Sequence, residues 1–213
     1  MRVRWIGLAL ALALVGAAAG YGIGLLSRDE SDTFASAQPM PAQSPSVPIE
    51  PTATYSPYLD YPTLEPDLDY QTHRIGVPPY QWEYDAPKGW VVTQPDLNEM
   101  TWRPKDEPTL GGFLLRVKLI NDHLTPAQMG EQKRLAVVGL YEDVDVTGQS
   151  GDQLSFYFRE PVTQTRRYDL FKWFTSPGGT EADFEMSVAG REPDQVGLED
   201  LLEHVAASVR RLP

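Results

Sequence analysis

One apolar run near the start of the chain, Trp5–Leu26, limits what this protein can fold into more than any other stretch. It contains no charged side chain, and Arg2 and Arg4 come just before it. As a helix, its roughly 22 residues would rise about 33 Å, which matches the roughly 30 Å hydrocarbon core of a bilayer. Because basic side chains stay on the cytoplasmic side, we expect residues 1–4 in the cytoplasm, a transmembrane signal-anchor over residues 5–26, and the rest of the chain outside.

A cleaved secretory signal is the alternative to a retained anchor. It would use Trp5–Val15 as its apolar core and be cut at the small residues near Ala19. The apolar run continues past that position to Leu26, which favours a retained, single-pass anchor in the plasma membrane. Cleavage would instead release a secreted protein, and both alternatives place the C-terminal domain outside the cytoplasm.

Glycines recur at intervals of four residues within the expected membrane helix, at Gly16, Gly20 and Gly24. They would therefore lie on one helix face. Small residues at this spacing allow two membrane helices to approach closely, so these three are candidate helix-pairing residues. The alternative is that glycine is simply common in membrane segments.

Composition excludes several classes of protein and site. The chain has no cysteine, which rules out disulfides, thiolate metal sites and lipid attachment through cysteine. The net charge is −12, and an acidic chain is a poor match for the phosphate backbone of nucleic acids. We therefore expect no nucleic-acid partner, and we expect membrane contact only through residues 5–26.

Residues 27–79 are rich in proline, with serine, threonine, glutamine and alanine between the prolines. Ser31–Thr54 has no apolar periodicity, so we expect it to be disordered or extended. A chain of this kind is typical of a spacer that holds a folded domain away from the membrane. We therefore expect residues 27–79 to be an extracytoplasmic linker.

Tyrosines set among acidic residues and prolines distinguish the second half of this linker, Tyr55–Tyr70. They are Tyr55, Tyr58, Tyr61 and Tyr70. They are candidate partner-binding residues in a linear recognition motif, or they pack against the domain that follows. The sequence leaves both alternatives open.

Residues 80–213 have the pattern of a folded α+β domain. Alternating apolar and polar side chains predict strands, and apolar residues three or four positions apart predict helices. In the strand at 166–175, aromatic side chains occur on both faces. This strand either lies between two helix layers, which we expect, or carries a ligand groove. The expected strands are 81–84, 89–93, 99–103, 113–119, 142–147, 153–159, 166–175 and 182–189. The expected helices are 124–140 and a last one that begins near Asp194 and whose apolar face extends to Leu212.

Two stretches carry a resemblance to a known family. Asp85-Ala86-Pro87-Lys88-Gly89-Trp90 is similar to the entry motif of PsbP-like domains, and the aromatic hairpin Tyr168–Val188 with the closing helix resembles their later half. The resemblance covers residues 80–213 and implies a central antiparallel sheet flanked by helices. Bacterial members of this family are often anchored or secreted, and they typically bind or assist rather than catalyse.

No catalytic constellation is evident. The three histidines, His73, His123 and His204, have no partner at metal-ligand spacing. We therefore expect no catalytic, cofactor-binding or metal-binding residues. The expected function is a non-catalytic binding or accessory module in the bacterial cell envelope, whose partner is an envelope protein or polymer. The alternatives are a small-ligand sensor that signals through a membrane partner, and an envelope hydrolase.

Overall fold

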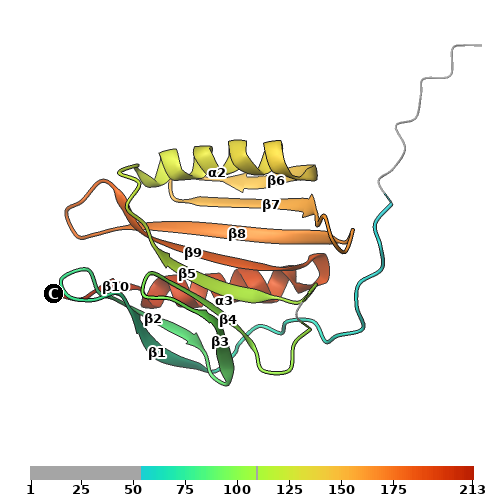
Figure 1. Cartoon of the computed structure of the whole chain (residues 1–213), viewed down its shortest axis with the longest axis horizontal. Helices are drawn as coiled ribbons and strands as arrows, with labels where there is room; N and C mark the ends of the chain where they lie inside the picture. Colours follow the sequence, from blue (N-terminus) through green and yellow to red (C-terminus); the bar gives the residue numbers. More distant parts are fainter. Residues whose placement is uncertain (1–53, 109) are drawn as a thin grey trace, which may run out of the picture. The chain divides into compact units, whose positions relative to one another are not determined.

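A computed structural model describes residues 54–213, with the exception of Thr109 (Figure 1). The expected anchor at 5–26 and its glycines, Gly16, Gly20 and Gly24, lie outside these residues. Within the described part, no helix is long and apolar enough to cross a membrane.

Two antiparallel sheets and two α-helices make up the described part of the chain, which confirms the α+β class. The larger sheet has seven strands in the order β3-β4-β5-β9-β8-β7-β6, and the smaller has three in the order β1-β2-β10. The strands of the larger sheet are β3 (Trp90–Pro95), β4 (Glu99–Pro104), β5 (Leu114–Leu119), β6 (Glu142–Gln149), β7 (Gln153–Arg159), β8 (Arg166–Thr175) and β9 (Ala182–Arg191). The smaller sheet consists of β1 (Tyr70–Ile75), β2 (Trp82–Pro87) and β10 (Arg210–Arg211), and the helices are α2 (Pro126–Leu140), the short 3-10 helix η1 (Glu192–Asp194) and α3 (Gln195–Ser208).

The main core lies between one face of the large sheet and a layer formed by α3 and the small sheet. Phe184, Met186 and Val188 alternate along β9 and are each fully buried against this layer. Leu198 and Leu201 of α3 are equally buried. Burial of an apolar side chain of this size stabilises the fold by about 1.5–3 kcal/mol, so this interface supplies most of the driving force for folding.

The opposite face of the large sheet holds a second, smaller core under α2, which packs on β6, β7 and β8 (Figure 1). Strand β8 contributes to both cores: Tyr168 and Leu170 face α3, whereas Phe171 and Trp173 face α2. The strand therefore lies between two helices, as its two aromatic faces predicted.

Helix α2 begins at Pro126, two residues after the expected start, and its first turn has a capping box. The Thr125 hydroxyl accepts a hydrogen bond from the Gln128 backbone N–H, and the Gln128 side chain accepts one from the Thr125 N–H. This reciprocal arrangement satisfies two backbone donors that a helix N-terminus otherwise leaves free. Helix α3 ends at Ser208, so the expected extension of the last helix toward Leu212 is wrong; residues 210–211 instead form a short strand on β2.

The expected domain boundary at Tyr80 is also wrong. Residues 70–75 form β1, which pairs with β2 along its whole length, and the described residues belong to one compact unit. The expected linker 27–79 therefore includes residues that are part of the fold. The physical reason is that Ile75 is the only buried residue of β1. The strand therefore shows little apolar periodicity of its own.

The stretch at residues 81–93 forms two strands around a turn, as expected, but these strands do not form a hairpin. β2 pairs with β1 and β10, whereas β3 pairs with β4 in the other sheet. Gly89 lies between them with φ of +85°, a left-handed conformation that glycine adopts without strain. The turn therefore carries the chain from one layer to the next.

Candidate functional site

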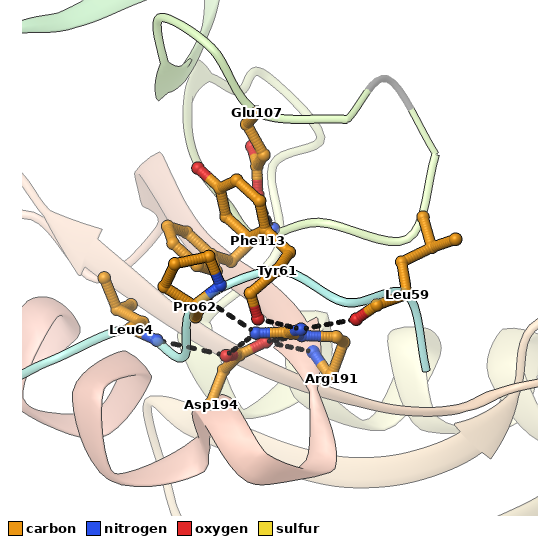
Figure 2. Close-up of polar contacts among 8 residues, drawn as sticks. All are labelled: Leu59, Tyr61, Pro62, Leu64, Glu107, Phe113, Arg191 and Asp194. Atoms are coloured by element: carbon orange, nitrogen blue, oxygen red, sulfur yellow. Dashed lines mark hydrogen bonds and ion pairs between the residues drawn. The ribbon is translucent and has the colours of Figure 1, made fainter. Parts of the chain in front are cut away.

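Residues 54–69 cross the folded unit before β1 begins, and we call this segment the strap. It contains no helix and no strand. It therefore has no ladder of backbone hydrogen bonds. Two single backbone bonds, from the Ser56 N–H to the Gln164 carbonyl oxygen and from the Lys88 N–H to the Asp69 carbonyl oxygen, join it to the domain, and side chains supply the other contacts. Figure 2 shows the residues that hold it.

Arg191 and Asp194 form the centre of this attachment, and we call them the clamp. Arg191 ends β9 and Asp194 ends η1, and their side chains are 4% and 0% exposed. The guanidinium donates to both carboxylate oxygens, at 2.7 Å from Nη2 to Oδ1 and 2.9 Å from Nε to Oδ2. These bonds raise the pKa of Arg191 above its ordinary value. The clamp is a buried ion pair with bidentate geometry.

The clamp holds the strap through main-chain atoms. Arg191 donates from Nη1 to the carbonyl oxygens of Leu59 (3.2 Å) and Tyr61 (2.7 Å), and from Nη2 to that of Pro62 (2.8 Å). Asp194 accepts from the backbone N–H of Leu64 at 3.1 Å (Figure 2). The pair thus binds an extended peptide by its backbone.

Leu64 adds an apolar anchor beside the clamp. It is 7% exposed and belongs to the main core. The strap passes very close to α3 here, since a Cβ added to Gly197 would lie 2.2 Å from the Leu64 carbonyl oxygen. A real side chain cannot occupy that space, so glycine at position 197 permits the strap to lie where it does.

Two of the candidate partner-binding tyrosines contact charged residues of the domain. The Tyr55 ring lies 5.0 Å from the Arg159 guanidinium. The Tyr58 hydroxyl donates to Glu192 at 3.3 Å, and burial together with the Glu192 charge raises the pKa of Tyr58 to about 12. Both rings are half-buried.

The other two tyrosines contact aromatic rings. Tyr61 lies 5.7 Å from the Phe113 ring centroid, and Tyr70 stacks on His204 at 3.6 Å. All four tyrosines therefore pack on the folded unit, which is the second of the two alternatives that the sequence left open. Their role in binding a partner stays a prediction.

A buried carboxylate lies beside the strap, on the loop between β4 and β5. Glu107 accepts a hydrogen bond from the Phe113 N–H and lies 3.5 Å from Arg103. Burial raises the pKa of Glu107. The clamp and Glu107 together place several charges in the interior, where charges are tolerated only when they are paired.

Two further charged residues lie on the α2 side of β8. Arg167 is 7% exposed, and burial lowers its pKa. The Asp169 carboxyl is enclosed, and burial raises its pKa to about 7. Among the described residues, neither Arg167 Nη1 nor Asp169 Oδ1 has a hydrogen-bond partner. Burial of these two atoms without hydrogen-bond partners therefore destabilises the folded state.

The described part of the chain also has a pocket of about 500 Å³ beside the small sheet, which we call the cleft. Trp82, Leu119 and Ile120 contribute apolar surface, and Tyr80, which is 66% exposed, lies at its rim. Its other lining residues are Gly76, Val77, Asn98, Asn121, Asp183 and Arg211.

Polar groups at the cleft differ in how far they are already engaged. Arg211 lies 5.6 Å from the Tyr80 ring and donates to the Ser176 hydroxyl, which also contacts Asp183. The side-chain amides of Asn98 and Asn121 make no hydrogen bond to any residue that the structure describes. These two amides are therefore free to contact a ligand.

The cleft and the clamp lie at opposite ends of β9. Asp183 is the second residue of that strand and Arg191 is the last. Eight residues of extended chain span about 27 Å, so the cleft and the clamp are separate sites.

None of the three histidines lines the cleft. His123 is exposed and lies 2.9 Å from Glu181. His204 stacks on Tyr70, whereas the His73 ring is tilted by 51° relative to that of Trp102. Within residues 54–213, Thr109 aside, no three metal-ligating side chains come together.

Sequence reasoning did not identify Arg191, Asp194, Asn98 or Asn121 as site residues. Arg191 and Asp194 are three positions apart at a strand–helix junction, which is a local signal. Their strap partners, however, are about 130 residues away in the sequence. Only the folded structure shows that these residues are close in space.

Comparison with known proteins gives little further information. No protein-family model matches the chain, and no curated protein matches it. Among solved structures, it is similar to a crystal structure from Bacteroides thetaiotaomicron VPI-5482, with 12% sequence identity and a TM-score of 0.40. The match covers 62% of this chain and 45% of that one, so this chain spans less than half of the protein that it matches.

Proposed function

We propose that the protein is a membrane-tethered, extracytoplasmic module that binds an envelope protein or polymer without catalysing a reaction. The cleft is the observation that carries this proposal. It combines apolar surface with the unengaged amides of Asn98 and Asn121, and binding sites typically pair apolar surface with a few polar groups that fix orientation. We further propose that the α+β unit is a PsbP-like domain, in which binding is the typical role.

The strap supports the tethered arrangement. Because residues 54–69 are attached to the folded unit through the clamp, the proposed tether between the anchor and the domain shortens to residues 27–53. A flexible chain of that length spans roughly 30 Å. The domain would remain close to the membrane while its cleft, at the far end of β9, remains open to a partner.

Site-specific photo-crosslinking in the full-length chain tests this function. A photo-reactive phenylalanine analogue would replace Tyr80 at the cleft or, as a matched control, Leu140, which is 71% exposed on α2. In cell membranes, we expect a product of defined mass from position 80 that position 140 does not give. No product from position 80, or the same product from both positions, would contradict the proposal.

A small-ligand sensor is the second candidate. The volume of about 500 Å³ lies within the usual range of about 300–1,000 Å³ for small-molecule sites. The same crosslinking experiment distinguishes the two, because a sensor predicts that a dialysable small-molecule fraction from the envelope blocks labelling at position 80.

A further inference from the structure

We propose that two copies of this chain bind to each other by exchanging their straps, so that the clamp of each copy holds the strap of the other. This inference goes beyond the proposed function and does not depend on the cleft. It rests on how the clamp binds the strap and on the conformation of residues 67–69, the last residues of the strap before β1, which we call the hinge.

The clamp makes no distinction between a strap from its own chain and one from a second copy. Its contacts are to three carbonyl oxygens and one N–H of the strap backbone. Specificity comes from the fit of Leu64 against Gly197 and of Tyr61 against Phe113. The strap of a second copy satisfies each of these contacts, because its sequence is identical to that of the strap that the clamp already holds.

The hinge is strained in the closed chain. Asp67 lies two residues before the end of the strap and has φ of +61°, a left-handed conformation that is unfavourable for residues with a side chain. Its N–H is held by Asp200 at 2.9 Å. An extended hinge, which reaches a second copy, releases this strain, and short strained hinges favour exchange.

Exchange in both directions gives a closed, two-fold symmetric dimer. Each copy donates one strap and receives one, so every clamp holds a strap and the assembly closes as a dimer rather than growing into a filament. The contacts of the strap are then the same in monomer and dimer. The balance between them depends on hinge strain, which favours the dimer, and on the entropy of association, which opposes it.

Cysteine crosslinking between two full-length variants tests the exchange. The chain has no cysteine, so introduced thiols are unique. The Ser56 N–H donates to the Gln164 carbonyl oxygen at 2.9 Å, with both residues exposed. We would mix Ser56→Cys chains with Gln164→Cys chains and add a short bifunctional maleimide. Exchange predicts a covalent pair of the two different chains.

Three controls make each outcome decisive. Ser56→Cys mixed with Ser150→Cys, an exposed position in the β6–β7 turn, should give no heterodimer. The double variant Ser56→Cys/Gln164→Cys shows within a single chain that the two positions react. Asp67→Gly relieves the hinge strain in the closed form, and we expect it to reduce the linked heterodimer about fivefold. A double variant that reacts within one chain, together with no interchain product, overturns the proposal, as does an equal yield from the Ser150→Cys pair.

Discussion

Arg191 and Asp194 place opposite charges where almost no solvent reaches them, and such a pair stabilises a protein only when its remaining donors and acceptors are satisfied. Here the strap satisfies them, since three carbonyl groups and one N–H complete the set. The strap and the clamp therefore depend on each other.

Asp194→Asn should be strongly destabilising, because it keeps the size of the side chain but leaves the Arg191 charge buried without its partner. Removal of one member of a buried ion pair costs about 3–5 kcal/mol, and we expect a loss of that size in the free energy of unfolding measured with urea. Asp200→Asn is the control, since Asp200 accepts a hydrogen bond at an exposed position of the strap; it should cost less than about 1 kcal/mol. Equal stabilities for the two variants would show that the clamp is not needed.

A pair of helix glycines tests the close approach of the strap to α3. Gly197→Ala places a methyl group against the Leu64 carbonyl oxygen, and we expect a loss of about 1–3 kcal/mol, as for other overpacked sites. Gly139→Ala, in α2 with nothing within 4 Å, should instead stabilise the protein by up to about 1 kcal/mol. Thermal unfolding of both variants measures the two effects, and stabilisation by Gly197→Ala would contradict the packing described for the strap.

Asp169 predicts a pH dependence of stability. Burial raises its pKa from 3.8 to about 7, and the nearby charges of Arg167 and Lys133 oppose this only in part. Between about pH 4 and pH 7 the unfolded chain has lost this proton while the folded chain retains it. The contribution of the Asp169 carboxyl to the free energy of unfolding is therefore greatest below pH 4. It falls as the pH rises to 7 and stays constant above that.

Asp169→Asn removes this dependence. We expect the variant to gain about 2–4 kcal/mol relative to the wild type between pH 4.5 and pH 8, from about 1.4 kcal/mol per pKa unit. Urea unfolding of both proteins at the two pH values measures the difference, in which the other titrating groups cancel. A difference that does not change with pH would mean that Asp169 is ionised in the folded state at both.

At the scale of secondary-structure elements, the sequence predicted the end of α2 correctly and its start to within two residues. Its capping residues, Thr125 and Gln128, lie three positions apart in the chain, so no tertiary information was needed. Strands β7 and β8 were also predicted with their full bounds, because their apolar side chains alternate clearly. Local patterns sufficed wherever an element is buried on a regular face.

Thr125→Ala should remove the cap of α2 and cost about 1 kcal/mol. Chemical denaturation followed by circular dichroism checks this value. Thr180→Ala, at an exposed turn position between β8 and β9, serves as the control and should change the stability by less than about 0.5 kcal/mol. A loss no larger than that of the control would mean that the capping box contributes nothing.

Elements that depend on distant partners could not be predicted in this way. β1 was assigned to the linker, and β10 to the last helix, since each becomes a strand only by pairing with β2. The strap was left open for the same reason: its prolines and acidic residues resemble a linker, and its fixed position comes from the clamp. Asp194 was expected to start the last helix, and it does lie at the N-cap of α3, but its side chain makes no cap hydrogen bond and holds Arg191 and Leu64 instead.

In the folded unit as a whole, attachment and binding are separated. The strap joins the unit at the end of β9 where Arg191 lies, and the cleft lies near the start of that strand. Movement of the tether would therefore leave the cleft unchanged as long as the clamp holds. Both the proposed shortening of the tether to residues 27–53 and the exchange of straps require that residues 54–69 be held by the clamp in the full-length protein.

Hydrogen exchange of the strap in the full-length chain, measured by mass spectrometry, tests that requirement directly. The Leu64 N–H donates to the buried Asp194 carboxylate, so we expect the peptide that contains it to exchange at least about 100-fold more slowly than an unstructured peptide. Asp194→Asn should abolish this protection, while α3 remains protected. If the strap of the wild-type chain exchanges at the rate of an unstructured peptide, the clamp does not hold it and the account is wrong.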